Sequence, residues 1–168
     1  TRGPTEQLES SLELTLTDDD QEKVSASVSG PLTDNLGYRV AGYYDDIEGW
    51  VDNLHDNDKT DGSEKWGVNT RLDWQLSESF ALKFQGKYDD SDSSCCSPAL
   101  KYVEDVEKAQ VLTVIPLTTA APELIPLIGD DNTTVSLDDV TEVKSENLQL
   151  SMKADWDISE HNVLSITT

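Results

Sequence analysis

The sequence predicts an all-β fold, an antiparallel meander of about seven strands that carries one long, partly helical insertion. Three observations lead to this prediction. Apolar and polar residues alternate with a period of two over long stretches, and short polar turns join several of these stretches. The stretches also exceed the roughly 5 to 6 residues that are common for strands of soluble sheets.

The alternation is clearest in three segments, Lys65–Leu76, Phe80–Tyr88 and Glu146–Ile158. A helix would scatter their apolar residues around its circumference, whereas a strand gathers them on one face. We therefore expect strands with one apolar and one polar face. In the first segment the apolar face contains Trp66, Val68, Thr70, Leu72, Trp74 and Leu76.

Weaker alternation occurs in four further segments, which bring the expected number of strands to about seven: Leu12–Leu16, Val24–Val28, Leu36–Val40 and Leu164–Ile166. Short polar turns are expected at Thr17–Gln21, Leu32–Asn35, Leu76–Ser79 and Ile158–His161. The two longer connections are Asp45–Glu64 and Asp89–Ser145.

The insertion at residues 89–145 differs from the rest of the chain because part of it has a helical rather than an alternating pattern. Its segment Pro98–Ala109 predicts a short helix, because Ser97 suits the N-cap and Pro98 suits the first turn. The apolar residues of that segment that fall near one helical face are Leu100, Val103 and Val106.

The charge balance excludes some partners. The 168 residues include 12 Lys and Arg against 34 Asp and Glu, which gives a net charge of −22. Nucleic acid and anionic lipid headgroups both attract basic proteins, so neither is expected as a partner. The carboxylates gather in segments that we expect to be connections: Asp18–Asp20, Asp45–Glu48, Asp56–Asp61, Asp89–Asp92 and Asp130–Asp131.

Aromatic residues lie near the ends of the predicted strands. Trp66 and Trp74 are eight residues apart, as are Phe80 and Tyr88. That separation corresponds to roughly 26 Å of strand, or about 19 Å of height at a 45° tilt, which approaches the apolar band of an outer-membrane barrel. Periodicity alone does not distinguish such a barrel from a soluble sheet with aromatics packed over its rim.

Two stretches of the sequence resemble TonB-dependent outer-membrane receptors. Val28–Asn53 contains a Ser-Gly-Pro-Leu turn, a strand with Arg-x-Ala-Gly-x-Tyr and a Gly-Trp-x-x-Asn loop, similar to the first barrel strands of that family. Ala154–Thr167 resembles a later hairpin that ends in Leu-Ser-Ile-Thr, and Thr1–Pro4 is similar to the end of the family's plug domain.

The resemblance implies that residues 1–168 are a single segment, the N-terminal part of a receptor barrel of about 22 strands in the outer membrane of a Gram-negative cell. Turns at Thr33 and Ser77 would be periplasmic, and residues 89–145 would form an extracellular loop. The implied partners are the plug and remaining barrel of the parent chain, TonB through that plug, and a small-molecule ligand.

The parent protein would take up a siderophore, a vitamin or an oligosaccharide, and this segment would supply barrel wall and extracellular loops. Candidate ligand-binding residues are Trp50, Asp52 and Asn53, which lie in the Gly-Trp-x-x-Asn loop. Neither plug nor TonB box is found in the segment, and about seven strands do not close a barrel. Because the sequence shows no initiator Met and no signal-peptide features, Thr1 is expected to be the edge of an excised segment or of a processed product. The isolated fragment is expected to cover its apolar face with its own insertion or by dimerising.

No enzyme, cofactor or metal site is expected. Ser/His/Asp arrangements, phosphate-binding glycine loops and the HExxH motif are not found in the sequence. The segment Asp56–Gly62 differs from a calcium loop because its glycine falls one place late and no Glu occupies the twelfth position. His55 and His161 lie in polar connections, where we expect them to be solvated.

The two cysteines, Cys95 and Cys96, are adjacent in the sequence. Neighbouring cysteines seldom bridge each other, so we expect a loop pair that is free or bonded outside this chain.

An alternative from a different class is a secreted, soluble β-sandwich that binds carbohydrate or calcium. It predicts two sheets whose apolar faces pack against each other. A piece of barrel wall instead predicts one sheet whose apolar face prefers detergent, lipid or a partner.

Overall fold

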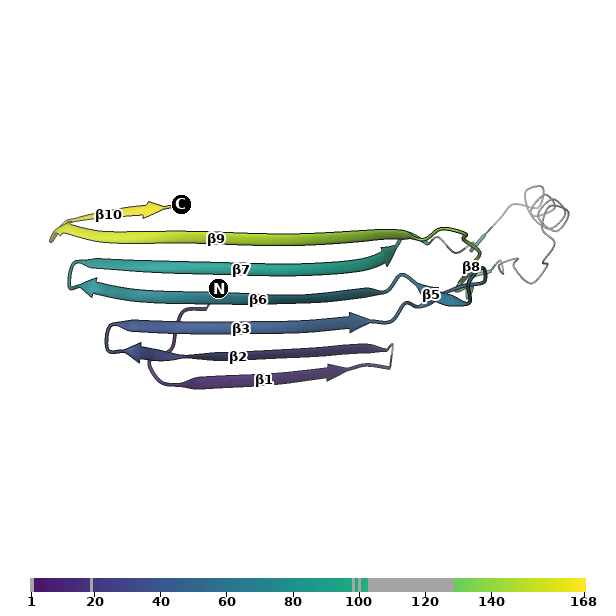
Figure 1. The fold of residues 1–168 in the computed structure, drawn as a ribbon, viewed down its shortest axis with the longest axis horizontal. Helices are drawn as coiled ribbons and strands as arrows, with labels where there is room; N and C mark the ends of the chain where they lie inside the picture. The colour runs from purple at the N-terminus through teal and green to yellow at the C-terminus, as the bar shows by residue number, and fades with distance from the viewer. Residues whose placement is uncertain (1, 19, 98, 100, 103–128) are drawn as a thin grey trace, which may run out of the picture.

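In the computed structural model, which describes residues 2–18, 20–97, 99, 101–102 and 129–168, two sheets account for all the secondary structure (Figure 1). The larger sheet has seven antiparallel strands: β1 (Glu9–Leu16), β2 (Gln21–Thr33), β3 (Leu36–Ile47), β6 (Ser63–Ser77), β7 (Phe80–Cys95), β9 (Thr141–Ser159) and β10 (Asn162–Thr167). The smaller has three: β4 (Val51–Asn53), β5 (Asp58–Thr60) and β8 (Thr134–Val135). The predicted all-β meander is confirmed.

The seven strands follow one another across the large sheet in chain order, with β4, β5 and β8 set aside in the long connections. The predicted short turns join β1 to β2, β2 to β3, β6 to β7 and β9 to β10. The first and last strands, β1 and β10, lie at opposite edges, so the sheet is not closed (Figure 1).

Several strands extend further than the alternation of the sequence predicts. β7 continues to Cys95 and β9 begins at Thr141, so the connection between them spans residues 96–140. The prediction that Asp45–Glu48 and Asp89–Asp92 lie entirely in connections is wrong, because Asp45 and Asp46 belong to β3 and Asp89–Asp92 to β7. The backbone ladder continues past the apolar segment since it needs no apolar side chains, and lysines lie beside some of these carboxylates.

The apolar side chains of the large sheet are exposed, which is the reverse of a soluble sheet. Among the described residues the buried hydrophobic side chains are Val51 and Val135, both in the small sheet. Leu150 in β9 is 75% exposed, whereas Arg71 and Asp73 on the opposite face of the sheet are only partly accessible. The described part of the chain thus contains no second sheet packed on this apolar face, in contrast to the sandwich alternative.

The register of the strands makes the apolar face continuous. One row across the sheet pairs Tyr38 with Leu72, Leu72 with Phe84 and Phe84 with Met152. Because the side-chain period of a strand is two, one such row places most large apolar residues of four strands on the same face.

Aromatic residues border the apolar face at two levels. At one level Tyr44 pairs with Trp66, whose ring centroid lies 5.2 Å from that of Tyr88. At the other, Phe80 pairs with Trp156 beside the short turns. Tyr43 follows the opposite parity along β3 and therefore faces the polar side.

Cys95 and Cys96 form a disulfide bond, so the expectation of free or externally bonded cysteines is wrong. Successive side chains of a strand point to opposite faces, but Cys96 directly follows the last residue of β7 and has a φ of 71°. That left-handed backbone interrupts the alternation and allows adjacent sulfurs to bond. The predicted helix at Pro98–Ala109 falls, apart from residues 99, 101 and 102, outside the described residues.

Candidate functional site

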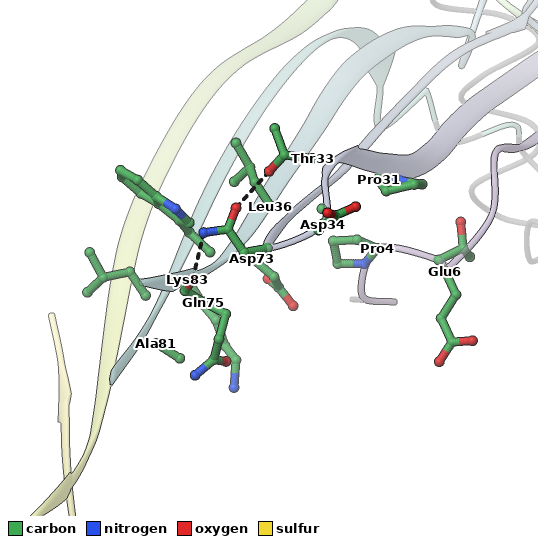
Figure 2. A pocket seen from close by; sticks show the side chains of 15 residues that line it. Pro4, Glu6, Pro31, Thr33, Asp34, Leu36, Asp73, Gln75, Ala81 and Lys83 are labelled. Carbon is green, nitrogen blue, oxygen red and sulfur yellow. Dashed lines mark hydrogen bonds between the residues drawn. The ribbon is translucent and has the colours of Figure 1, made fainter. Parts of the chain in front are cut away.

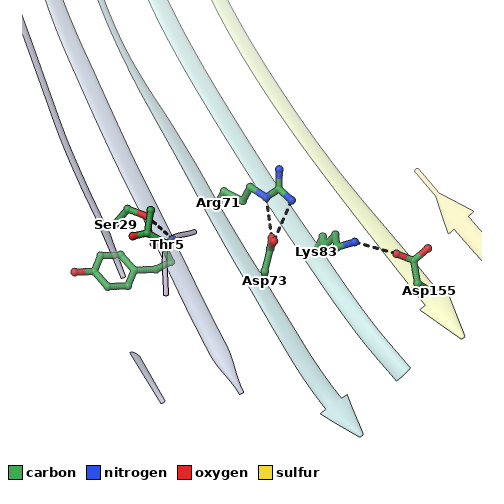
Figure 3. Close-up of polar contacts among 7 residues, drawn as sticks. Thr5, Ser29, Arg71, Asp73, Lys83 and Asp155 are labelled. Atoms are coloured by element: carbon green, nitrogen blue, oxygen red, sulfur yellow. Dashed lines mark hydrogen bonds and ion pairs between the residues drawn. The ribbon is translucent and has the colours of Figure 1, made fainter. Parts of the chain in front are cut away.

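The N-terminal segment, residues 2–8, crosses the polar face of the large sheet before it enters β1. The backbone N–H of Thr5 donates to Oγ of Ser29 at 3.0 Å, and this hydroxyl donates to the carbonyl of Tyr38 at 3.1 Å (Figure 3). Ser29 is only 1% exposed. A Cβ at Gly37 would lie 2.8 Å from Cβ of Pro4, so glycine at this position makes room for the segment.

A cavity of about 580 Å³ lies where this segment meets the turn ends of the strands (Figure 2). Asn35 organises its wall: its Oδ1 accepts from Oγ1 of Thr33 at 2.7 Å, and its Nδ2 donates to the carbonyl of Gln75 at 3.0 Å. Pro4 and Glu6 line the side formed by the N-terminal segment. The cavity therefore depends on that segment being in place.

Ion pairs run along the polar face beside the segment. Arg71 binds Asp73 through two contacts, Nε to Oδ1 at 2.7 Å and Nη2 to Oδ2 at 3.0 Å (Figure 3). Asp155 accepts from Lys83 at 3.2 Å and from Lys153 at 2.8 Å, and the hydroxyl of Ser165 donates to it at 2.6 Å. These contacts hold charged side chains in place on the polar face of the sheet.

Towards the long connections the polar face carries a second group of contacts. Nζ of Lys23 lies 3.0 Å from Oδ2 of Asp45, whose other oxygen accepts from Gln21 at 2.8 Å. Asp45 lies one residue beyond Tyr44, outside the apolar band. The hydrogen bond from Gln21 and then the contact with Lys23 hold the pKa of Asp45 below its usual value.

Two adjoining cavities open on the polar face between β1 and β7. The first, of about 340 Å³, is the serine cavity, whose polar wall includes Ser11, Ser25, Ser27, Arg39, Asn69, Lys87 and Asp89. The second, of about 200 Å³, is the arginine cavity, lined by Arg2, Arg39, Ala41, Asn69 and Arg71. Arg39, Ala41 and Asn69 border both cavities, which together are called the trough. The lining combines hydroxyl, amide, cationic and carboxylate groups, which suit a polar ligand.

The three residues predicted to bind ligand lie in or beside the small sheet, but they do not converge. Trp50 is 59% exposed and Asp52 is exposed, whereas Asn53 is 1% exposed. The Asn53 amide donates to the carbonyl of Leu137 and accepts from the N–H of Leu137, both at 2.9 Å. Asn53 therefore joins two loops, and only Trp50 and Asp52 present side chains to solvent.

The small sheet is held by contacts between the two long connections. Oγ1 of Thr60 lies 2.9 Å from Oγ of Ser97, and the N–H of Ser97 donates to Oδ1 of Asp61 at 3.2 Å. Carboxylates of the acidic run at residues 56–61 thus accept hydrogen bonds from backbone N–H groups. Asp56 accepts one from the N–H of Asp58 at 3.1 Å. The described residues contain no group of three His, Cys, Asp or Glu side chains placed to hold a metal ion.

Sequence analysis identified neither Ser29 nor the residues of the trough. The sequence indicates only that Arg39 and Asn69 occupy polar positions in segments where apolar and polar residues alternate. Their proximity depends on the pairing of Arg39 with Arg71 and of Ala41 with Asn69, which no local pattern reveals.

Comparison with known proteins supports the fold. No family model and no curated protein matches the sequence. A chain in the solved structure of the FpvAI–pyocin S2 complex is similar over 99% of this chain, with a TM-score of 0.64 and 15% sequence identity. This chain spans 20% of that chain's length, and the likeness is one of fold. No helix in the described ranges is long and apolar enough to cross a membrane.

Proposed function

We propose that this chain forms part of the barrel wall of an outer-membrane receptor of the TonB-dependent type, which takes up a small-molecule ligand such as a siderophore, a vitamin or an oligosaccharide. The FpvA receptor of the similar complex is TonB-dependent, which supports this family. Binding and passage, rather than catalysis, are the proposed roles of the chain. Its partners would be the plug and remaining strands of the parent chain, and TonB.

The observation that carries the proposal is the reversed exposure of the large sheet. In water an exposed, continuous apolar face spanning seven strands would favour aggregation. In a bilayer the same face lies against lipid, and the polar face lines the lumen. The aromatic levels at Trp66 and at Trp156 fit the two interfacial belts of such a barrel.

The N-terminal segment adds a second line of support. It passes over the polar face, where Thr5 contacts Ser29 and Pro4 lies against Gly37. A chain that enters the first strand from the lumen side, close to the turns at residues 34–35 and 78–79, matches the expected junction between plug and barrel. The turns would then face the periplasm, and the small sheet with Trp50 and Asp52 would face the cell exterior.

A matched pair of substitutions on β9 tests which face meets lipid. Leu150 and Gln149 are neighbours on opposite faces of this strand. For the full-length protein folded into phospholipid bilayers, we expect Leu150→Arg to cost about 2–4 kcal/mol in a urea titration and Gln149→Arg to be nearly neutral, because only the first places a charge in lipid. Fractionation of cells should recover the unmodified protein in the outer membrane.

The soluble alternative makes the opposite prediction. An arginine at exposed position 150 of a water-soluble protein would be tolerated, and the protein would appear in the secreted or soluble fraction. Equal tolerance of the two substitutions, together with a soluble location, would overturn the proposal.

A further inference from the structure

The bond between Cys95 and Cys96 lies where the large sheet meets the small one. Cys95 is the last residue of β7 and pairs with Thr141 of β9. Two residues further on, the hydroxyl of Ser97 already lies 2.9 Å from that of Thr60 in β5. The disulfide therefore spans the point at which the chain leaves one sheet for the other.

Hydrogen bonds on both sides of the disulfide fix this junction. Before it, the N–H of Ser94 donates to the carbonyl of Gly62, and the N–H of Gly62 donates to Oγ of Ser94, both at 3.1 Å. After it, the N–H of Ser97 donates to Oδ1 of Asp61 at 3.2 Å. Ser97 is 5% exposed and its partner Thr60 is 1% exposed. A change in the backbone between Ser94 and Ser97 would therefore separate buried polar groups from their partners.

The backbone of Cys96 is unusual among the described residues. Four of them that are not glycine have a positive φ, with values from 54° to 71°: Asp20, Asn57, Asp61 and Cys96. The first three are Asp or Asn, whose short polar side chains suit left-handed backbone, whereas cysteine has no such preference. A conformation of this kind persists where its surroundings impose it. At Cys96 the bond to the neighbouring residue is a covalent constraint, because it closes a small ring that includes the backbone of both cysteines.

Reduction would remove this constraint. Cys96 is exposed, so a small thiol reaches the bond from solvent. A dithiol supplies two electrons and two protons: the S–S bond breaks, Cys95 and Cys96 both become thiols, and the dithiol becomes a disulfide. Cys96 is then free to return to the negative φ that L-residues favour, which displaces Ser97 from Thr60 and Asp61.

We propose that the disulfide of Cys95 and Cys96 is a redox-sensitive latch, which holds the small sheet at the end of β7 and which a dithiol releases. The coupling runs through β5, because β5 contacts Ser97 and pairs with β4. Trp50 and Asp52, in and beside β4, are thus presented on a fixed sheet in the oxidised protein and on a mobile one after reduction. The inference goes beyond the proposed function and does not rest on it.

Hydrogen exchange of the full-length protein in bilayers, with and without dithiothreitol, tests the latch. We expect reduction to speed exchange in residues 51–60 about tenfold, the change that corresponds to loss of the two hydrogen bonds of Ser97. Residues 66–75 and 81–90 of β6 and β7 should exchange as before. Labelling with maleimide and intact-mass spectrometry verify that reduction is complete.

Two outcomes of this measurement would overturn the latch. Unchanged exchange in residues 51–60 of the fully reduced protein would show that the bond does not hold the small sheet. Equal acceleration in both sheets would show a general loss of stability in place of a local release.

A pair of double variants tests the role of the backbone at Cys96. Cys95→Ser/Cys96→Ser should exchange as the reduced protein does and should not respond to dithiothreitol. Cys95→Ser/Cys96→Gly should exchange more slowly in residues 51–60, because glycine adopts a positive φ without a covalent constraint. Equal exchange in the two variants would overturn the left-handed backbone of Cys96 as the link between the bond and the small sheet.

Ser97→Ala tests whether the effect passes through Ser97. The variant loses the contact with Thr60 while the disulfide is intact, so exchange in residues 51–60 should already be faster in the oxidised state. Reduction should then add less than it does in the unmodified protein, since both changes remove the same contact. A full tenfold response to reduction in Ser97→Ala would overturn this route.

The latch and the receptor proposal fail separately. If the protein assembles in bilayers and reduction leaves the small sheet unchanged, the latch is wrong and the receptor proposal stands. If the protein does not enter bilayers, the receptor proposal is overturned, and the same exchange measurement in aqueous buffer still decides the latch.

Discussion

The hydroxyl of Tyr43 on β3 donates a hydrogen bond to Oδ1 of Asp89 on β7, at 3.0 Å, across the strand that separates them. That strand, β6, contributes Gly67 at the level of both residues. A Cβ at position 67 would lie 2.7 Å from Cε1 of Tyr43 and 2.8 Å from Oδ1 of Asp89. Nζ of Lys87 on β7 also contacts Asp89, at 2.7 Å, so β3 and β7 supply the side chains of one polar cluster and β6 supplies the glycine between them.

Gly67→Ala should destabilise the sheet by about 1–3 kcal/mol, because the added methyl group overlaps Tyr43 and the hydrogen bond to Asp89 must be given up. Gly42→Ala is the control, since the nearest atom to its Cβ would be 3.5 Å away. Urea titrations of both variants in bilayers measure the difference. A Gly67→Ala variant as stable as Gly42→Ala would show that Tyr43 does not cross β6.

Asn53→Ala should loosen the small sheet, because the partly buried N–H and carbonyl of Leu137 would both lose their hydrogen-bond partner. We expect a local cost of about 1–3 kcal/mol, read as faster hydrogen exchange in residues 51–60 and 132–137. Asp52→Ala removes an exposed neighbour and should leave exchange unchanged. Similar exchange in the two variants would contradict the structural role assigned to Asn53.

Ser29→Ala should release the N-terminal segment from the polar face. The backbone N–H of Thr5 would lose its acceptor, and the methyl group that replaces the hydroxyl offers none. Limited proteolysis should then cut residues 2–8 sooner. In Ser25→Ala, which alters the same face of β2 away from the segment, cleavage should proceed at the unmodified rate, and early cleavage there would show that this contact is not specific.

Asp45 should make the free energy of unfolding of the protein depend on pH in the acid range. Its pKa is lowered in the folded state by Gln21 and Lys23, so its stabilising contribution is fully present above the pKa of the unfolded chain, near 3.8, and is lost as pH falls through the folded value. Asp45→Asn should flatten the decline in stability below about pH 4. Urea titrations at several pH values measure this, with Asp34→Asn in an exposed turn as the control. An unchanged acid profile in Asp45→Asn would contradict the assignment.

The disulfide predicts a simple labelling pattern. Unreduced protein should take up no maleimide, whereas reduced and denatured protein should take up two, since the only cysteines are Cys95 and Cys96. Intact-mass spectrometry distinguishes the states. Labelling of unreduced, denatured protein would show that the bond is absent.

The prediction from sequence worked best where the signal was local and repeated. The alternation in Lys65–Leu76 corresponds to β6, and the turn residues after Leu76 and after Ile158 lie where hairpins form. It failed where pairing is remote. β4 pairs in parallel with β8, so Asp52 lies beside Thr134 although β6 and β7 separate the two residues in the sequence. Strands of three and two residues are also too short to show a periodic pattern.

The candidate sites divide in the same way. Trp50 could be found from the sequence as an exposed aromatic residue in a loop, but burial of Asn53 depends on Leu137, which is 84 residues away. Arg39, Asn69 and Arg2 come from three separate segments. Their meeting depends on the register of β3 against β6 and on the path of the N-terminal segment over Gly37.

By itself the sequence determined that this chain forms strands with two unlike faces, because a period of two has no other regular backbone solution. Only the tertiary structure showed which face of the sheet packs against other parts of the chain. The alternation places Leu72 and Arg71 on opposite faces of β6, but it does not indicate which of the two faces is exposed. The arrangement of all seven strands, with the N-terminal segment on the polar side, leaves the apolar side exposed, and the proposed function rests on that exposure.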